Sequence, residues 1–149
     1  MIVKNYETPG KAPKDARRTA GHDAEQQMAH YLAREFESAS DVAVLHGLRL
    51  VDDTRTDVGG GPMVAQIDHL VLHRCGALIV ESKSCAGSVK IAGSSSGRDE
   101  WTIMTRREKR WRGMPSPIQQ ANRQAQVLRR VLQGRRDEVL GKALFGLMQ

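Results

Sequence analysis

The chain has 149 residues, of which 40% are hydrophobic and 27% are charged. This length favours a single domain, and the composition is typical of globular proteins rather than of collagen-like, mucin-like or disordered chains. The longest purely apolar runs, such as residues 77–80, are far shorter than the roughly 20 residues that cross a bilayer. The first residues also lack the apolar stretch of a signal peptide. We therefore expect a cytoplasmic protein without a membrane partner, whose two cysteines, Cys75 and Cys85, are free thiols.

The net charge of +6 is concentrated in the last third of the sequence. Residues 1–97 contain 11 Lys and Arg against 12 Asp and Glu, a net charge of −1, whereas residues 98–149 contain 12 against 5, a net charge of +7. Lys and Arg side chains displace the counterions that condense on phosphates, so this basic segment favours a nucleic-acid partner. A solvated basic face without a partner is the alternative.

The chain begins with a basic segment that contains Pro and Gly, and a helix follows it. Residues 1–20 have little apolar periodicity and are predicted to form a flexible basic arm ahead of a domain over residues 21–149. Apolar side chains then recur at helical spacing, which predicts a helix from Gly21 to Phe36. Glu25 lies on that apolar stripe, where an ionised carboxylate needs a cation, a metal or several donors. Alternatively, it is a first-turn glutamate stabilised by the helix dipole.

Segments rich in Val, Ile and Leu follow and predict a sheet. The expected strands cover residues 42–50, 64–72, 77–83, 88–91 and 101–105. The sequence HRCG between the second and third of them indicates a hairpin turn. The glycine-rich residues 51–61 are expected to form a loop, and the basic sequence RREKRWR follows the last strand.

A second helix has clear signals at both ends. Ser116 and Pro117 suit the N-cap and the first helical position, Gln119 completes a capping-box pattern, and Gly134 ends the helix. Its apolar residues recur at steps of three and four and are expected to pack on the sheet: Ile118, Ala121, Ala125, Leu128 and Leu132. The final residues, KALFGLMQ, resemble a strand without a terminating turn, so we expect a chain cut from a longer protein.

Asp68, Glu81 and Lys83 are the residues most indicative of chemistry. Side chains alternate faces along a strand, so Glu81 and Lys83 project from the same face. If the turn is centred on the HRCG sequence, Asp68 lies directly opposite Glu81, with the two Cβ atoms roughly 5 Å apart. A three-residue loop would pair Asp68 with Ser82 instead.

Two carboxylates among apolar neighbours repel each other unless a cation neutralises them. Mg²⁺ or Mn²⁺ with oxygen ligands would do so. Lys83 would then be suited to orienting a water nucleophile or stabilising the charge that develops on a phosphoryl group. Alternatively, Lys83 pairs with Glu81 or Asp68 as a structural ion pair at the end of a strand.

The order of these motifs resembles the PD-(D/E)xK signature of restriction-endonuclease-like nucleases. More closely, the chain resembles the nuclease-related domain (NERD) family, through AGHDAE ahead of the first helix, QIDHLVL, ALIVESKS, Gly87, Trp101 and SPIQQA, in that order over about residues 20–132. The resemblance implies an α/β, restriction-endonuclease-like fold, in which helices flank a central mixed β-sheet. It also implies hydrolysis of DNA phosphodiester bonds with Mg²⁺ or Mn²⁺.

The resemblance further implies roles for individual residues. The catalytic residues would be Asp68, Glu81, Lys83 and Gln120, and the metal ligands would be Glu25, Asp68, Glu81 and Ser82. Ser82 would contribute its backbone carbonyl, and Gln120 would contact the scissile phosphate or position Lys83. Ser116 stands where the family more often has Asn, a change that preserves N-capping. The family's fold commonly continues with another strand beyond Gln149, so an open sheet edge could pair two copies of the chain.

Two further groups of residues are expected near the substrate. Nucleic-acid contacts are assigned to Arg106, Arg107, Lys109, Arg110, Trp111 and Arg112. His69 and His73 are about 13 Å apart along a strand, too far to share one metal, and are expected to bond to protein groups or to phosphate.

Two functions remain open from the sequence. The first is a metal-dependent nuclease acting on DNA through the Asp and Glu-x-Lys site. The second is a nuclease-like module that binds nucleic acid or a partner protein without cutting and serves a larger protein.

Overall fold

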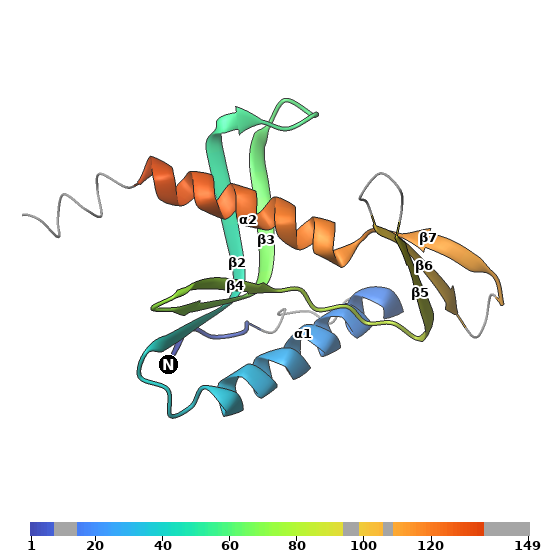
Figure 1. Ribbon diagram of the computed structural model, residues 1–149, viewed down its shortest axis with the longest axis horizontal. Coiled ribbons are helices and arrows are strands. Elements are labelled where there is room, and N and C mark those ends of the chain that lie inside the picture. The colour runs from blue at the N-terminus through green and yellow to red at the C-terminus, as the bar shows by residue number, and fades with distance from the viewer. Residues whose placement is uncertain (8–14, 94–98, 106–108, 136–149) are drawn as a thin grey trace, which may run out of the picture.

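The computed structural model describes residues 1–7, 15–93, 99–105 and 109–135. Within these ranges the chain forms two helices and seven strands (Figure 1). In chain order they are β1 (Ile2–Lys4), α1 (Ala16–Glu35), β2 (Val42–Thr56), β3 (Pro62–His73), β4 (Gly76–Val80), β5 (Gly87–Gly93), β6 (Asp99–Thr105), β7 (Trp111–Met114) and α2 (Pro117–Gly134). The strands make a mixed four-stranded sheet, β1-β2-β3-β4, and an antiparallel three-stranded sheet, β5-β6-β7. This architecture confirms the predicted α/β class with a mixed sheet and helices.

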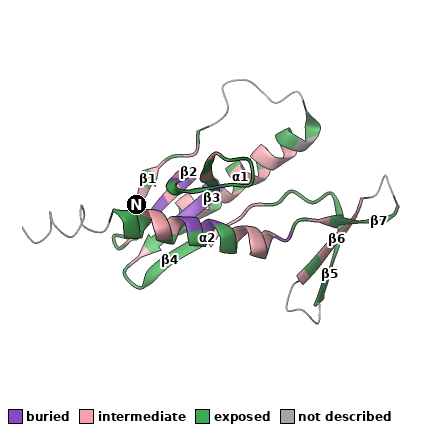
Figure 2. Cartoon of the chain, turned by 90° about the horizontal axis from the view of Figure 1, so that it is seen from above, coloured by how far each residue is buried: buried purple, intermediate pink, exposed green. Residues whose placement is uncertain are grey.

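The core lies where the two helices meet the four-stranded sheet. The buried apolar side chains are Ala29 of α1, Val127 of α2, and Val44, Ala65, Ile67, Leu70 and Val71 of β2 and β3. Figure 2 shows the buried residues gathered along β2, β3 and the middle of α2. Neither described helix is long and apolar enough to span a membrane.

The predicted flexible arm over residues 1–20 was wrong at both of its described ends. β1 pairs in parallel with β2, and the amino group of Met1 donates a hydrogen bond to the carbonyl of Val42 at 2.7 Å. α1 begins at Ala16, five residues earlier than expected. Three residues are too few to show the alternation that identifies a strand, and the first turn of α1 carries no apolar stripe.

The predicted loop over residues 51–61 is mostly β-structure. β2 continues to Thr56 and β3 begins at Pro62, so the two strands form a long hairpin. The turn is closed by Asp57, whose carboxylate accepts hydrogen bonds from the backbone N–H groups of Gly59 at 2.8 Å and Gly61 at 3.2 Å. Polar residues at the exposed end of a hairpin have a composition like that of a loop, which misled the sequence prediction.

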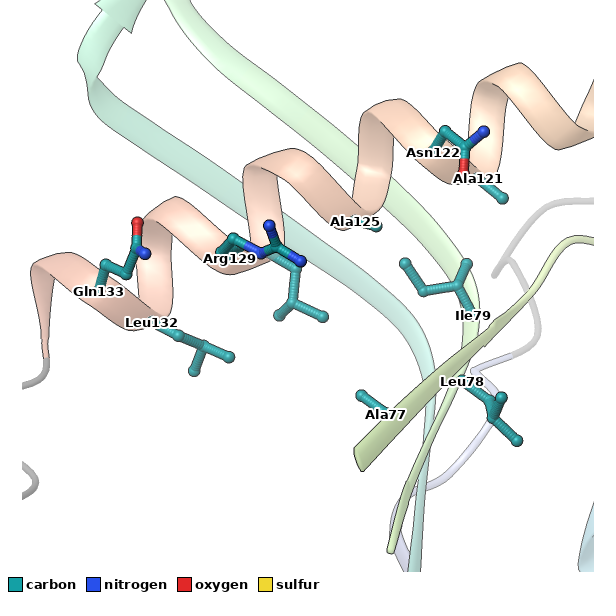
Figure 3. Close-up of a pocket in the computed structure, with 10 residues that line it drawn as sticks. Ala77, Leu78, Ile79, Ala121, Asn122, Ala125, Arg129, Leu132 and Gln133 are labelled. Carbon is teal, nitrogen blue, oxygen red and sulfur yellow. The ribbon is translucent and has the colours of Figure 1, made fainter. Parts of the chain in front are cut away.

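The prediction for the buried face of α2 was also wrong. Gln124 and Val127 are its buried residues, whereas the apolar stripe is largely uncovered, with Ile118 56% and Leu132 60% exposed. The stripe lines an open groove of about 800 Å³ beside the edge strand β4 (Figure 3). The helix is turned so that its amide side chains, rather than its alanines and leucines, face β3. The predicted N-cap is confirmed, because the Ser116 hydroxyl accepts a hydrogen bond from the Gln119 backbone N–H at 3.1 Å.

The three-stranded sheet is joined to the start of α2 through one carboxylate. Asp99 at the start of β6 accepts hydrogen bonds from the Ser116 hydroxyl at 2.6 Å, from the Gln119 side chain at 3.2 Å and from the Trp101 indole. The Gln119 side chain therefore bonds to Asp99 rather than completing a capping box. The expected further strand over KALFGLMQ lies outside the described residues.

Candidate functional site

The β3–β4 hairpin has the register that the sequence argument favoured. Leu72 lies opposite Ala77 and His69 lies opposite Val80, which excludes the three-residue loop. Continuing that register places Asp68 beside Glu81, the first residue after β4. There the Ser82 backbone N–H donates a hydrogen bond to Asp68 Oδ2 at 2.9 Å.

Asp68 is a half-buried carboxyl group beside two other acids. Burial is the main reason that its pKa is raised to about 6, and the negative charges of Glu81 and Glu25 raise it further. The hydrogen bond from Ser82 and the charge of Lys83 act in the opposite direction. A bound cation would offset the repulsion between these neighbouring carboxylates.

The Glu81 carboxylate is held by three donors and is 5% exposed. Its Oε1 accepts hydrogen bonds from Gln120 Nε2 at 2.6 Å and from the Lys83 ammonium, which forms an ion pair with it. Gln120 Oε1 in turn accepts from Lys83 Nζ at 3.1 Å. Hydrogen bonds thus join three of the four residues assigned to catalysis, and the fourth, Asp68, lies beside Glu81. The ion pair that the sequence left as an alternative for Lys83 is present.

Gln124 is a member of the site that the sequence analysis missed. Its Nε2 donates to Glu81 Oε2 at 2.8 Å and to the Gln66 carbonyl at 2.6 Å. Its Oε1 is buried and has no hydrogen-bond partner among the described residues. The available signal was its position four residues after Gln120, which places both amides on one face of α2.

Two buried histidines form a hydrogen-bonded chain that ends at the Ser82 hydroxyl. His69 is fully buried, and its Nε2 lies 3.1 Å from the Ser82 hydroxyl while its Nδ1 lies 2.8 Å from Nδ1 of His46. Burial, with a smaller contribution from His46, lowers the pKa of His69 to about 4. Both rings are therefore neutral at pH 7, and one donates the proton of the shared bond. His73 instead accepts a hydrogen bond from the Cys75 backbone N–H at 3.2 Å in the hairpin turn.

Glu25 lies in the interior of α1, so the first-turn interpretation was wrong. Its side chain is 31% exposed, and its Oε2 accepts a hydrogen bond from the Tyr6 hydroxyl at 3.4 Å. Burial and the charge of Glu25 raise the pKa of Tyr6. A cavity of about 730 Å³ lies between α1 and Lys83 and opens to solvent at the site.

The sequence matches the family model of the nuclease-related domain (NERD) over residues 20–146. The chain belongs to the nuclease-related domain family. This family lies within the wider PD-(D/E)xK group. No curated protein and no solved structure matches the chain.

In this nuclease-related domain, the assigned metal ligands are near one another without forming a closed cage. No group of three His, Cys, Asp or Glu side chains in the described part of the chain is arranged to hold a metal ion. Asp68 and Glu81 are neighbours at the end of the hairpin, and Glu25 is close enough to raise the pKa of Asp68.

The described residues among those assigned to nucleic acid lie in β7 of the three-stranded sheet or directly before it. Lys109, Arg110, Trp111 and Arg112 are exposed in and just before β7, whereas Arg106 and Arg107 lie outside the described residues. Trp111 is 46% exposed, and its strand pairs with β6. Asp99 connects this sheet to α2, which carries Gln120 and Gln124.

Proposed function

We propose that this nuclease-related domain hydrolyses phosphodiester bonds of DNA in a reaction that requires Mg²⁺ or Mn²⁺. The observation that carries the proposal is the fixed Glu81 carboxylate, which two glutamines and Lys83 hold beside the raised-pKa carboxyl group of Asp68. Two neighbouring carboxyl groups, one with a raised pKa, beside a lysine are an arrangement that is frequent at functional sites.

The donor set fits a hard divalent cation. Mg²⁺ is usually held by one or two carboxylates and keeps several waters, so a closed protein cage is not needed. Asp68, Glu81 and the backbone carbonyl of Ser82 would hold the ion, and Glu25 would assist. When bound, such an ion supplies polarisation of the phosphate and a water of lowered pKa.

Lys83 has the position of a group that stabilises developing charge. Its ammonium is held between Glu81 Oε1 and Gln120 Oε1, which limits its motion. A fixed cation beside a phosphate favours the transition state because the negative charge of the phosphoryl oxygens increases there. Gln120 therefore acts as a positioning residue for both Lys83 and Glu81.

The test is cleavage of supercoiled plasmid and of labelled single-stranded DNA with Mg²⁺, with Mn²⁺ and with EDTA. We expect metal-dependent cutting by the wild type and a loss of about 10³-fold or more in Asp68→Asn and in Lys83→Met. Exposed Glu100 on β6 provides the matched control, and Glu100→Gln should cut at the wild-type rate. Thermal melts establish that every variant is folded.

Cleavage that survives both site substitutions would overturn the proposal. So would salt-sensitive DNA binding by a wild type that cuts with neither metal, a result that would favour the binding module.

A further inference from the structure

A second groove joins the candidate site from the side of the β2–β3 hairpin. It has a volume of about 510 Å³ and lies between α2 and the hairpin, which extends past the helix in Figure 1. Gln66, Gln120 and Gln124 line its inner end. The side-chain amides of Gln120 and Gln124 donate to Glu81, and the backbone carbonyl of Gln66 accepts from Gln124, so the groove adjoins the site.

The charge of this groove has one sign. Its lining includes Arg55, Arg123 and Arg130 and no acidic residue. Arg130 is committed to Asp52, with Nε 2.6 Å from Oδ2. Arg55 and Arg123 are exposed, and neither forms an ion pair or a hydrogen bond with another described residue. Two positive charges on the groove are therefore available to a ligand.

Two residues that line the groove bear on what it can bind: Arg130, which is bonded to the hairpin, and Gln124, whose side-chain oxygen lacks a donor among the described residues. Buried Asp52 bonds to Arg130 of α2 and to the Thr54 backbone N–H at 3.1 Å, which fixes the helix against the hairpin. Hydrogen bonds from Thr54 and then from Arg130 lower the pKa of Asp52, so this connection stays charged. Gln124 lines the same groove, and its buried Oε1 has no partner in the described part of the chain. A donor carried in by a ligand would satisfy that oxygen.

We propose that a DNA strand passing through the site continues along this groove, where Arg55 and Arg123 bind phosphates on one side of the scissile bond. This inference rests on the proposed function and names the surface that holds the substrate. The groove is distinct from the basic residues on β7, which belong to the other sheet. A polyanion suits it because its free charges are positive and it leads into the site.

The test measures binding in EDTA, so that cleavage does not interfere. The probe is fluorescein-labelled single-stranded DNA of about 20 nucleotides, titrated with wild type, with the double variant Arg55→Ala/Arg123→Ala and with Arg74→Ala. Arg74 is an exposed arginine in the β3–β4 turn, so its variant removes a positive charge away from the groove. The lysine variant Arg55→Lys/Arg123→Lys keeps both charges and tests rescue.

We expect the double alanine variant to bind about tenfold or more weakly. The slope of log Kd against log salt should fall by about 1.4, because roughly 0.7 is lost per phosphate contact on a single strand. Arg74→Ala should change Kd by less than about twofold, and the lysine variant should recover most of the slope.

Equal binding by wild type and the double alanine variant would overturn the inference, as would an equal loss in Arg74→Ala. The binding assay contains no metal and does not depend on cleavage. Failure of the wild type to cut DNA would therefore contradict the proposed function, and the binding result could still be interpreted.

Discussion

The two sheets of this protein differ in what surrounds them. The four-stranded sheet carries every buried apolar strand residue, together with the buried polar residues His46, Asp52 and His69. In the three-stranded sheet, all seven residues of β5 are exposed (Figure 2). Buried polar groups need partners to offset lost hydration. The histidine pair finds one in Ser82, and Asp52 finds its partners in Arg130 and Thr54.

The two sheets should therefore differ in how strongly substitutions affect activity and stability. Substitutions around the four-stranded sheet remove partners of buried groups, whereas most positions on the three-stranded sheet contact water. Asp99 is the exception, because it joins the second sheet to the start of α2.

Beyond the substitutions of Asp68 and Lys83, the largest effect is expected at Gln124. Gln124→Leu keeps much of the side-chain volume but removes the donor to Glu81 Oε2 and to the Gln66 carbonyl. Loss of a partner that orients a metal ligand typically costs about 10- to 100-fold in activity or metal affinity. Single-turnover cleavage measures this loss, with Gln133→Leu, at an exposed position near the other end of the same helix, as the control. An unchanged rate in Gln124→Leu would show that Glu81 does not need the hydrogen bond from Gln124, and would contradict this prediction.

The buried histidine pair should make stability depend on pH. The pKa of His69 is lowered from 6.5 to about 4. The stability that its neutral ring gives the folded protein is therefore complete above pH 6.5 and is lost as the pH falls toward 4. The free-energy difference between wild type and His69→Leu should therefore shift by about 2 kcal/mol against the wild type between pH 7.5 and pH 4.5. Urea denaturation at the two pH values measures it. A constant difference would contradict the assignment of a buried neutral ring.

Asp68 should act in the opposite direction in the metal-free protein. Its pKa is raised from 3.8 to about 6. The free-energy cost of keeping it ionised in the folded protein is therefore complete above pH 6 and disappears below pH 3.8. Asp68→Asn should therefore stabilise the metal-free protein at pH 8 by about 1–2 kcal/mol, allowing for partial solvent screening. The gain should vanish near pH 4. Destabilisation at pH 8 in urea denaturation would contradict a carboxyl group placed for a cation rather than for stability.

The smallest effect is expected at Asp99, which joins the three-stranded sheet to the start of α2. Asp99→Ala removes the acceptor for Ser116, Gln119 and Trp101, so the melting temperature should fall by a few degrees. Lys90→Ala, at an exposed position on β5, should leave it unchanged. Differential scanning calorimetry compares the two variants. Equal melting temperatures would mean that α2 starts independently of the second sheet.

Local patterns predicted the elements whose signals are local. The HRCG turn fixed the register of β3 and β4, and Ser116 with Pro117 marked the start of α2. The turn alone was enough to predict that Asp68 lies beside Glu81, whereas Gln120 was assigned to the site through the family resemblance. The residue order along the chain therefore contained most of the candidate site.

Features that depend on long-range contacts were not predictable in this way. Gln124 is buried because Glu81 and the Gln66 carbonyl accept from it, and no periodicity of apolar residues reports such a partner. The same bonds turn α2 so that its apolar stripe faces the groove beside β4. The parallel pairing of β1 with β2 is likewise a contact between distant segments.

We propose above all that Asp68 and Glu81 together hold a divalent cation. A calorimetric titration with Mn²⁺ at pH 7.5 tests it most directly, with wild type, Asp68→Asn and Glu81→Gln compared after complete removal of metals. We expect one Mn²⁺ per chain in the wild type and an affinity about tenfold or more weaker in each variant. Mn²⁺ binding of wild-type affinity in both variants would contradict the claim.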